Sequence, residues 1–152
     1  METGLVSVII TTYKREFSML KEAIDSVLAQ TYPHMEIMVV DDNGGDGEYT
    51  RRIEEGLKAY PQITYIKLAH NSGAQAARNT GIMASHGEFI AFLDDDDLWE
   101  PEKLAMQVPC FEDPGVGLVF CQGYVFDDKD IGHRRLYHKE GTFKEKPDFN
   151  GM

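Results

Sequence analysis

Four consecutive aspartates at positions 94–97 are the residues of this sequence best suited to chemistry. They follow a nearly apolar segment, residues 89–93, and precede Leu98, which places them at the end of a predicted buried strand. Neighbouring carboxylates repel one another unless protons or a cation relieve the repulsion, and hard divalent cations bind such oxygens. The cluster therefore predicts Mg²⁺ or Mn²⁺ as a cofactor, and a solvated acidic loop is the plainer alternative.

A second acidic pair, Asp41 and Asp42, ends the apolar segment 36–40 and precedes a glycine-rich loop, residues 43–47. A carboxylate in this place can accept a hydrogen bond from a ribose hydroxyl or a base N–H. Asp41 could equally cap the loop through Asx turns with Gly44 and Gly45. Asp42 is therefore the stronger candidate for a ligand contact.

Other candidate binding residues are Tyr13, Arg78 and Asn79. The ring of Tyr13 could stack on a nucleobase, although an aromatic residue there is more often a packing residue. Arg78 and Asn79 could face a diphosphate, and an exposed arginine on an alanine-rich helix is as often only solubilising. The chain has neither Gly-x-Gly-x-x-Gly nor Gly-x-x-x-x-Gly-Lys-Ser/Thr, so no glycine nest is available and a bound diphosphate would need a metal.

The strands and helices that must position these residues alternate along the chain. Short β-branched segments predict strands, and apolar residues at helical spacing predict helices. We expect strands at residues 5–11, 36–40, 63–68 and 88–93, and one or two further strands within 115–126. We expect helices from about Ser18 to before Tyr32, around 53–60, over 74–84 with Ser72 as N-cap, and from Pro101 to about Phe111. This order predicts an α/β fold, a Rossmann-like three-layer α/β/α sandwich around a mostly parallel sheet.

Ligands of such sheets bind beyond the carboxyl ends of the strands. Three polar clusters follow predicted strands, at residues 11–15, 41–43 and 94–97. We therefore expect all three to converge on one edge of the sheet.

The composition limits the possible partners. The 152 residues carry 26 acidic and 15 basic side chains, a formal charge of −11, which disfavours nucleic-acid binding without a local basic patch. The nearest to a patch, Arg134 and Arg135 with His133 and His138, is typical of a solvated hairpin or loop. No apolar run approaches the roughly 20 residues of a spanning helix, so we expect no membrane span in this chain and a cytoplasmic location, with Cys110 and Cys121 as buried free thiols.

The ordered motifs resemble a known family. They are residues 6–15 (VSVIITTYKR), 26–32 (SVLAQTY), 39–42 (VVDD), 71–73 (NSG), 77–81 (ARNTG) and 92–97 (FLDDDD). Together they are similar to the N-terminal half of a family 2 glycosyltransferase with the GT-A fold. The resemblance implies a nucleotide-sugar donor, with a UDP-sugar favoured, a divalent metal, and inverting transfer to a saccharide, lipid or protein acceptor, as in polysaccharide biosynthesis.

The resemblance also implies roles for individual residues. Thr11 and Tyr13 would line the base pocket, and Asp42 would bond the base. Asp95 would face the ribose or diphosphate. Asp96, with Asp94, would ligate the metal. The full nucleotide-sugar set implied is Thr11, Tyr13, Arg15, Asp42, Arg78, Asn79, Asp94 and Asp95.

Members of this family usually continue into an acceptor-binding half that holds the catalytic base. We expect one domain over residues 1–152, with a core at about 5–126 and the start of an incomplete acceptor-side region at 127–152. The base is then expected beyond residue 152, and donor binding is expected to survive better than turnover. Two alternatives are a haloacid-dehalogenase-like Mg²⁺-dependent phosphohydrolase using Asp94 and Asp96, and a non-catalytic, receiver-like nucleotide-binding module using Asp41 and Asp42.

Overall fold

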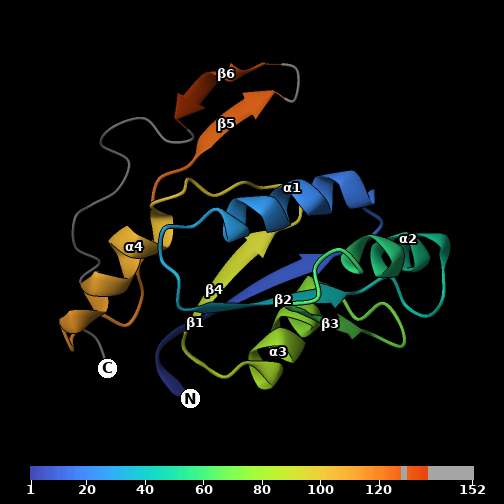
Figure 1. Ribbon diagram of the computed structural model, residues 1–152, viewed down its shortest axis with the longest axis horizontal. Helices are drawn as coiled ribbons and strands as arrows, with labels where there is room; N and C mark the ends of the chain where they lie inside the picture. Colours follow the sequence, from blue (N-terminus) through green and yellow to red (C-terminus); the bar gives the residue numbers. More distant parts are fainter. Residues whose placement is uncertain (128–129, 137–152) are drawn as a thin grey trace, which may run out of the picture.

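A parallel sheet forms the centre of the computed structural model, which describes residues 1–127 and 130–136 (Figure 1). Its strands lie in the order β3-β2-β1-β4 and all neighbouring pairs are parallel. The strands are β1 (Glu2–Thr12), β2 (Met35–Asp41), β3 (Ile63–Lys67) and β4 (Gly87–Asp94), and the helices that connect them are α1 (Phe17–Leu28), α2 (Glu48–Leu57) and α3 (Ala74–Ala84). The predicted α/β fold with a mostly parallel sheet is confirmed.

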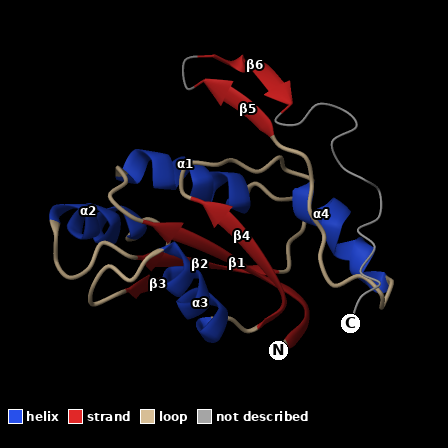
Figure 2. Cartoon of the chain, turned by 180° about the vertical axis from the view of Figure 1, so that it is seen from behind, coloured by secondary structure: helices blue, strands red, loops and turns tan. Residues whose placement is uncertain are grey.

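Helices cover both faces of the sheet, as Figures 1 and 2 show, with α1 and α2 on one side and α3 on the other. Alternation along β1 explains the arrangement, because successive side chains of a strand point to opposite faces. Val8 packs in a core cluster with Ile24 of α1 and Ile53 of α2. Its neighbour Ile9 packs with Ala77 of α3. The three layers therefore share a central strand that is buried on both faces.

The contact between α3 and β1 depends on a glycine. A Cβ atom placed on Gly81 would lie 2.5 Å from Cγ2 of Ile9, well inside van der Waals contact. Gly81 is buried in the middle of a helix, where glycine costs about 1 kcal/mol relative to alanine. The close approach of the helix to the sheet is therefore the reason for glycine here.

The segment that follows β4 is fastened to the end of α1. The Gln30 side chain accepts from Leu104 N–H at 3.0 Å and donates to the Glu100 carbonyl at 2.8 Å, and Thr31 N–H donates to the Pro101 carbonyl. The helix predicted from Pro101 is shorter than expected: α4 (Lys103–Gln107) is succeeded by a 3₁₀ turn, η1 (Val108–Glu112). Pro109 explains the early end of α4, because proline has no N–H to continue the α-helical hydrogen bonds, although Val108 before it keeps helical dihedrals of φ −58° and ψ −43°.

Two further strands form an antiparallel hairpin, β5 (Tyr124–Asp127) and β6 (Asp130–Leu136), set apart from the parallel sheet in both views. The expectation of strands from residue 115 onward was wrong for residues 115–123, which form no strand. β6 carries Arg134 and Arg135, so the hairpin interpretation of this basic segment is confirmed. His138 lies outside the described residues.

The cysteine prediction was half right. Cys110 and Cys121 are free, and both are exposed rather than buried. They lie in and after the short turn η1, which contains no buried residue. Within the described ranges 1–127 and 130–136, no helix combines the length and apolar character needed to cross a membrane.

Candidate functional site

The carboxyl ends of three neighbouring strands bring the three polar clusters together. Thr12 at the end of β1 is in register with Asp41 of β2, and Thr11 is in register with Asp94 of β4. The acidic pair and the aspartate run therefore lie on opposite sides of the end of β1. The predicted convergence on one sheet edge is confirmed.

Asp41 fixes the loops that follow β1 and β2. It is fully buried, and its Oδ1 accepts from both the backbone N–H and the side-chain amide of Asn43, at 2.8 and 2.7 Å. Asn43 Oδ1 in turn accepts the Lys14 N–H at 2.7 Å. Tyr65 donates its hydroxyl to Asp41 Oδ2 at 2.7 Å, and burial together with this carboxylate raises the pKa of Tyr65 far above its ordinary range. Asp41 forms an Asx turn as predicted, but its partner is the N–H of Asn43 and not Gly44 or Gly45. Asn43 and Tyr65 are positioning residues to which the sequence analysis gave no role.

Asp42 holds the loop that leads into α3. Its carboxylate accepts from Ser72 N–H at 2.7 Å, Gly73 N–H at 2.9 Å and the Asn71 amide at 3.0 Å. Ser72 is therefore not the N-cap of α3 as predicted: that residue is Gly73, with φ 86° and no side-chain cap, because the Ser72 backbone is committed to Asp42. A carboxylate has about four lone-pair sites, so Asp42 keeps one acceptor position after these three bonds. Asn71 is a further residue whose role the sequence motif alone did not define.

The aspartate run forms a tight turn at the end of β4, closed by a bond from Asp97 N–H to the Asp94 carbonyl at 3.1 Å. Two arginines from other elements hold it. Arg15 bridges Asp95 and Asp96, with Nε 3.1 Å from Asp95 Oδ1 and Nη2 2.8 Å from Asp96 Oδ2. Arg78 of α3 pairs with Asp94 at 2.6 Å. The two arginines that sequence analysis assigned to a ligand therefore lie at the predicted edge and contact the acidic turn.

Asp95 is the buried member of the turn. It is 6% exposed, and its Oδ2 is buried without a hydrogen-bond partner. Burial raises the pKa of Asp95 above its ordinary value, against the lowering influence of Thr12 and Arg15. Burial and the charges of Asp96 and Asp94 also raise the pKa of Asp97. The turn thus retains excess negative charge in spite of its two arginines.

The donor set of the turn fits a small divalent cation held in part by a ligand. No three His, Cys, Asp or Glu side chains converge on one point within the described part of the chain. Mg²⁺ is commonly bound by one or two carboxylates together with phosphate oxygens and water, so a complete protein cage is not required. The unpartnered Asp95 Oδ2 and the half-exposed carboxylates of Asp94 and Asp96 are oxygens of the kind that such a cation takes.

The remaining candidates surround this turn less closely. Tyr13 is 45% exposed, with Lys14 Nζ over its ring at 5.1 Å from the centroid, so a large part of its side chain is accessible to a ligand. Thr11 is partly exposed at the end of β1. Asn79 is exposed on α3, and no hydrogen bond between described residues joins it to the acidic turn. The structure therefore assembles Arg15, Asp42, Arg78 and the aspartates, with Thr11 and Tyr13 beside them and Asn79 at the margin.

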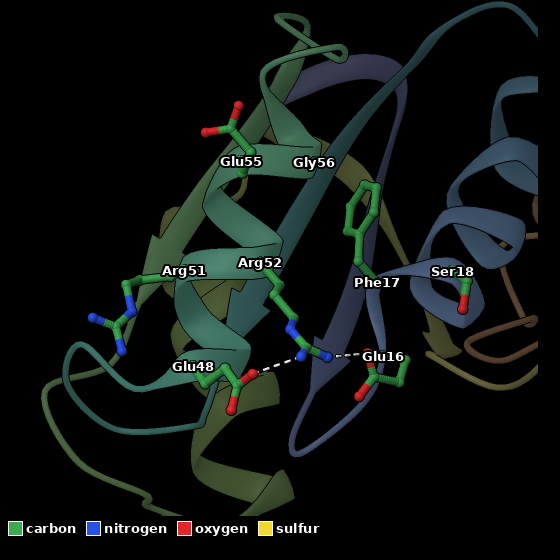
Figure 3. A pocket seen from close by; sticks show the side chains of 8 residues that line it. All are labelled: Glu16, Phe17, Ser18, Glu48, Arg51, Arg52, Glu55 and Gly56. Atoms are coloured by element: carbon green, nitrogen blue, oxygen red, sulfur yellow. Dashed lines mark hydrogen bonds and ion pairs between the residues drawn. The ribbon is translucent and has the colours of Figure 1, made fainter.

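A hollow of about 560 Å³ lies away from this edge, between the start of α1 and the face of α2 (Figure 3). Arg52 spans it with ion pairs to Glu16 and Glu48, and Phe17 lies against Gly56, where an added Cβ would be 2.3 Å from the ring. Every charged side chain that lines the hollow is exposed. Because no buried polar group points into it, we assign it no ligand.

Several proteins that are similar to this chain are named for a nucleotide sugar or were solved in complex with one. The chain is 38% identical over 108 residues to UDP-Glc:α-D-GlcNAc-diphosphoundecaprenol β-1,3-glucosyltransferase WfgD of Escherichia coli, covering 71% of this chain and 41% of the relative. Its fold matches the mannosyltransferase PcManGT of Pyrobaculum calidifontis in complex with GDP-Man and Mn²⁺, with a TM-score of 0.65 and 30% identity over 74% of this chain and 33% of the other. It also matches Staphylococcus aureus TarS 1–349 in complex with UDP-GlcNAc, with a TM-score of 0.58 and 31% identity over 72% of this chain and 31% of the other.

The chain thus spans less than half of the length of these proteins. The model of one family, described as glycosyl transferase family 2, matches residues 7–151. This match excludes the phosphohydrolase and receiver-like alternatives. The α/β architecture is that of the GT-A glycosyltransferases, and this chain is a domain of glycosyl transferase family 2.

Proposed function

We propose that this domain binds the nucleoside-diphosphate sugar of an inverting glycosyltransferase, with a UDP-sugar as the favoured donor and Mn²⁺ or Mg²⁺ as cofactor. The observation that carries the proposal is the buried, unpartnered Asp95 Oδ2 at the carboxyl edge of the sheet, with Arg15 and Arg78 on either side of the acidic turn. An unsatisfied buried carboxylate oxygen costs about 1–3 kcal/mol or more, and a ribose hydroxyl or a cation would satisfy it. Complexes of similar proteins with GDP-Man and UDP-GlcNAc support the same ligand class.

Different residues at this edge of the sheet would contact different parts of the ligand. Asp42 has one free acceptor position for a base N–H, and the exposed face of Tyr13 is available for stacking on the base. Thr11 lies between the two acidic clusters, where it would border the base and ribose. Asp95 Oδ2 would accept from a ribose hydroxyl.

The charged groups would hold the diphosphate. Arg15 and Arg78 supply guanidinium donors, which suit phosphate oxygens, and exposed Asn79 would contribute an amide from α3. Asp96 and Asp94 would ligate the divalent cation, which when bound neutralises charge that develops on the departing nucleoside diphosphate. An acidic domain can thereby bind an anion.

The rest of the reaction is also part of the proposal. In an inverting displacement an acceptor hydroxyl attacks the anomeric carbon, its proton passes to a base, and the nucleoside diphosphate leaves. Because the chain spans 41% of its glucosyltransferase relative, we place the base beyond residue 152 and the acceptor contacts in an acceptor-side region that begins at about residue 127. The acceptor is a saccharide, a lipid or a protein, as in polysaccharide biosynthesis.

Calorimetric titration tests the proposed donor site. UDP, GDP and dTDP are titrated into the 152-residue chain with Mn²⁺ and with EDTA, and the titrations are repeated on Asp95→Asn and Asp96→Asn. Asp46→Asn is the matched control, since Asp46 is an exposed loop aspartate paired with Lys67. We expect one nucleotide to bind only with Mn²⁺, and binding to be lost in both turn variants and kept in the control. Binding of no nucleotide, or equal binding in all four proteins, would contradict the proposal.

A further inference from the structure

We propose that Arg15 partly neutralises the acidic turn in the absence of ligand and, when a divalent cation binds, exchanges its contact with Asp96 for the diphosphate of the nucleotide sugar. The inference rests on the proposed function, and it assigns Arg15 two successive partners. The structure shows the first of them.

The two halves of the Arg15 fork have unequal surroundings. Nε contacts Asp95, whose side chain is 8% exposed, whereas Nη2 contacts Asp96, whose side chain is 45% exposed. An ion pair in solvent contributes little, and breaking a buried pair leaves an uncompensated charge. The contact with Asp96 is therefore the one that Arg15 can lose, and its contact with Asp95 can remain.

The backbone around Arg15 is anchored, so the exchange is a side-chain movement. Lys14 precedes Arg15 with a left-handed φ of 49°, and its N–H is held by Asn43. The Arg15 side chain is 33% exposed, which leaves it room to swing. The guanidinium therefore pivots about a fixed point between the turn and the solvent beyond the strand ends.

Charge balance gives the exchange its direction. The four aspartates of the turn face two guanidinium groups, those of Arg15 and Arg78, so negative charge remains uncompensated. A divalent cation on Asp96 supplies the missing charge and removes the need for Arg15 there. Arg15 is then free to bind an added phosphate, for which its planar fork is suited. Arg15 thus competes with the cation for Asp96 and cooperates with it in binding the nucleotide.

The test compares two affinities of the same variants. Mn²⁺ binding to the 152-residue chain without nucleotide is followed by electron paramagnetic resonance, and UDP and GDP binding at saturating Mn²⁺ by calorimetry. The variants are Arg15→Ala and Arg15→Gln, the second of which keeps a polar side chain of similar length without the charge. Arg51→Ala is the charge-matched control, because Arg51 is an exposed arginine of α2. Thermal unfolding establishes that each variant is folded.

The two affinities should move in opposite directions. We expect Arg15→Ala and Arg15→Gln to bind Mn²⁺ alone about three- to tenfold more tightly and to bind nucleotide about tenfold more weakly, with Arg51→Ala unchanged in both. A residue that only stabilises the turn would weaken both affinities together.

Mn²⁺ binding that is unchanged or weaker in both Arg15 variants, or undetectable in every protein, would overturn the competition for Asp96. If the wild-type chain binds Mn²⁺ and neither nucleotide, the proposed function and the exchange onto phosphate both fail, and the Mn²⁺ measurement still decides the competition.

Discussion

The backbone N–H of Lys14 donates to Oδ1 of Asn43 at 2.7 Å while Lys14 holds a left-handed φ of 49°, the only non-glycine residue of the described chain with a positive φ. A left-handed conformation costs a non-glycine residue about 1–2 kcal/mol. The cost arises between Tyr13 and Arg15, the two residues of this loop with proposed ligand contacts. Asn43 therefore stabilises a strained turn that orients both side chains.

Substitutions at these two positions should have opposite effects on stability. Asn43→Ala removes the acceptor of the Lys14 N–H and the amide that donates to Asp41 Oδ1, and is expected to lower the free energy of unfolding by about 1–2 kcal/mol. Lys14→Gly relieves the backbone strain and is expected to offset most of that loss in the double variant. Urea unfolding of both single variants and the double variant measures this. Lys14→Ala is the control, because alanine removes the side chain and keeps the strain. A loss in Asn43→Ala that Lys14→Gly leaves untouched would show that the strain is unrelated to Asn43.

Asp42→Asn should destabilise the fold as well as affect ligand binding. The Asp42 carboxylate is 3% exposed and accepts from Ser72 N–H, Gly73 N–H and the Asn71 amide. An amide NH₂ in place of one oxygen would face a donor, so we expect a loss of about 2–3 kcal/mol in the free energy of unfolding. Asp46→Asn, in an exposed loop, should change stability by less than about 0.5 kcal/mol. Urea unfolding curves with equal effects for the two variants would argue against a buried anchoring role.

The order of the elements and the edge where the polar clusters meet could be predicted from the sequence. A short β-branched apolar run such as residues 37–40, followed by a glycine-rich loop, is typical of a strand buried on both faces, and parallel strands place their carboxyl ends together. Ser72 and Pro101 were misassigned as helix-starting residues for one reason. In each, a backbone group bonds to a residue distant in sequence: Ser72 N–H to the Asp42 carboxylate, and the Pro101 carbonyl to Thr31 N–H. Local capping rules do not include such partners.

The contacts within the site could not be predicted from the sequence for a similar reason. Arg15 and Asp95 are 80 positions apart, and only the register of β1 with β4 brings them together. The sequence predicted that Arg15 and Arg78 lie at this edge. It did not predict their ion pairs with the aspartates, because these depend on side-chain rotamers and burial. Asn43, Tyr65 and Asn71 were given no role because each acts through hydrogen bonds to Asp41 or Asp42, which the sequence pattern does not show.

Gly81→Ala tests the contact between α3 and the sheet. In an unobstructed helix this change stabilises by about 1 kcal/mol, but here the added Cβ would lie 2.5 Å from Ile9 Cγ2. We expect Gly81→Ala to lower the free energy of unfolding by about 1–3 kcal/mol. The same substitution should cost less in an Ile9→Ala background, where the smaller side chain makes room for the added Cβ. Gly47→Ala is the matched control, because nothing lies within 4 Å of a Cβ at that position. Chemical denaturation of the single and double variants gives the coupling energy. A stabilised Gly81→Ala protein would mean that the helix and strand are not in close contact.

Glu36 should make stability depend on pH at the amino-terminal edge of the sheet, away from the proposed ligand site. Burial raises the pKa of Glu36, but hydrogen bonds from the Ser7 hydroxyl and from the His86 backbone and ring outweigh it, so the pKa lies below its ordinary value of 4.5. A carboxyl group with a lowered pKa stabilises the folded state above the unfolded-state pKa, and the stabilisation disappears as the pH falls through the folded-state pKa.

We therefore expect the free energy of unfolding of the wild-type chain to fall more steeply below about pH 4.5 than that of Glu36→Gln, which carries no titratable group there. At pH 7 the variant should be the less stable of the two, because Ser7 and His86 lose their charged acceptor. Urea unfolding at half-unit steps from pH 7 to pH 3 measures both slopes, with Glu55→Gln on the exposed face of α2 as control. Parallel curves for wild type and Glu36→Gln would show that the Ser7–Glu36–His86 contacts do not hold the carboxylate in its charged form.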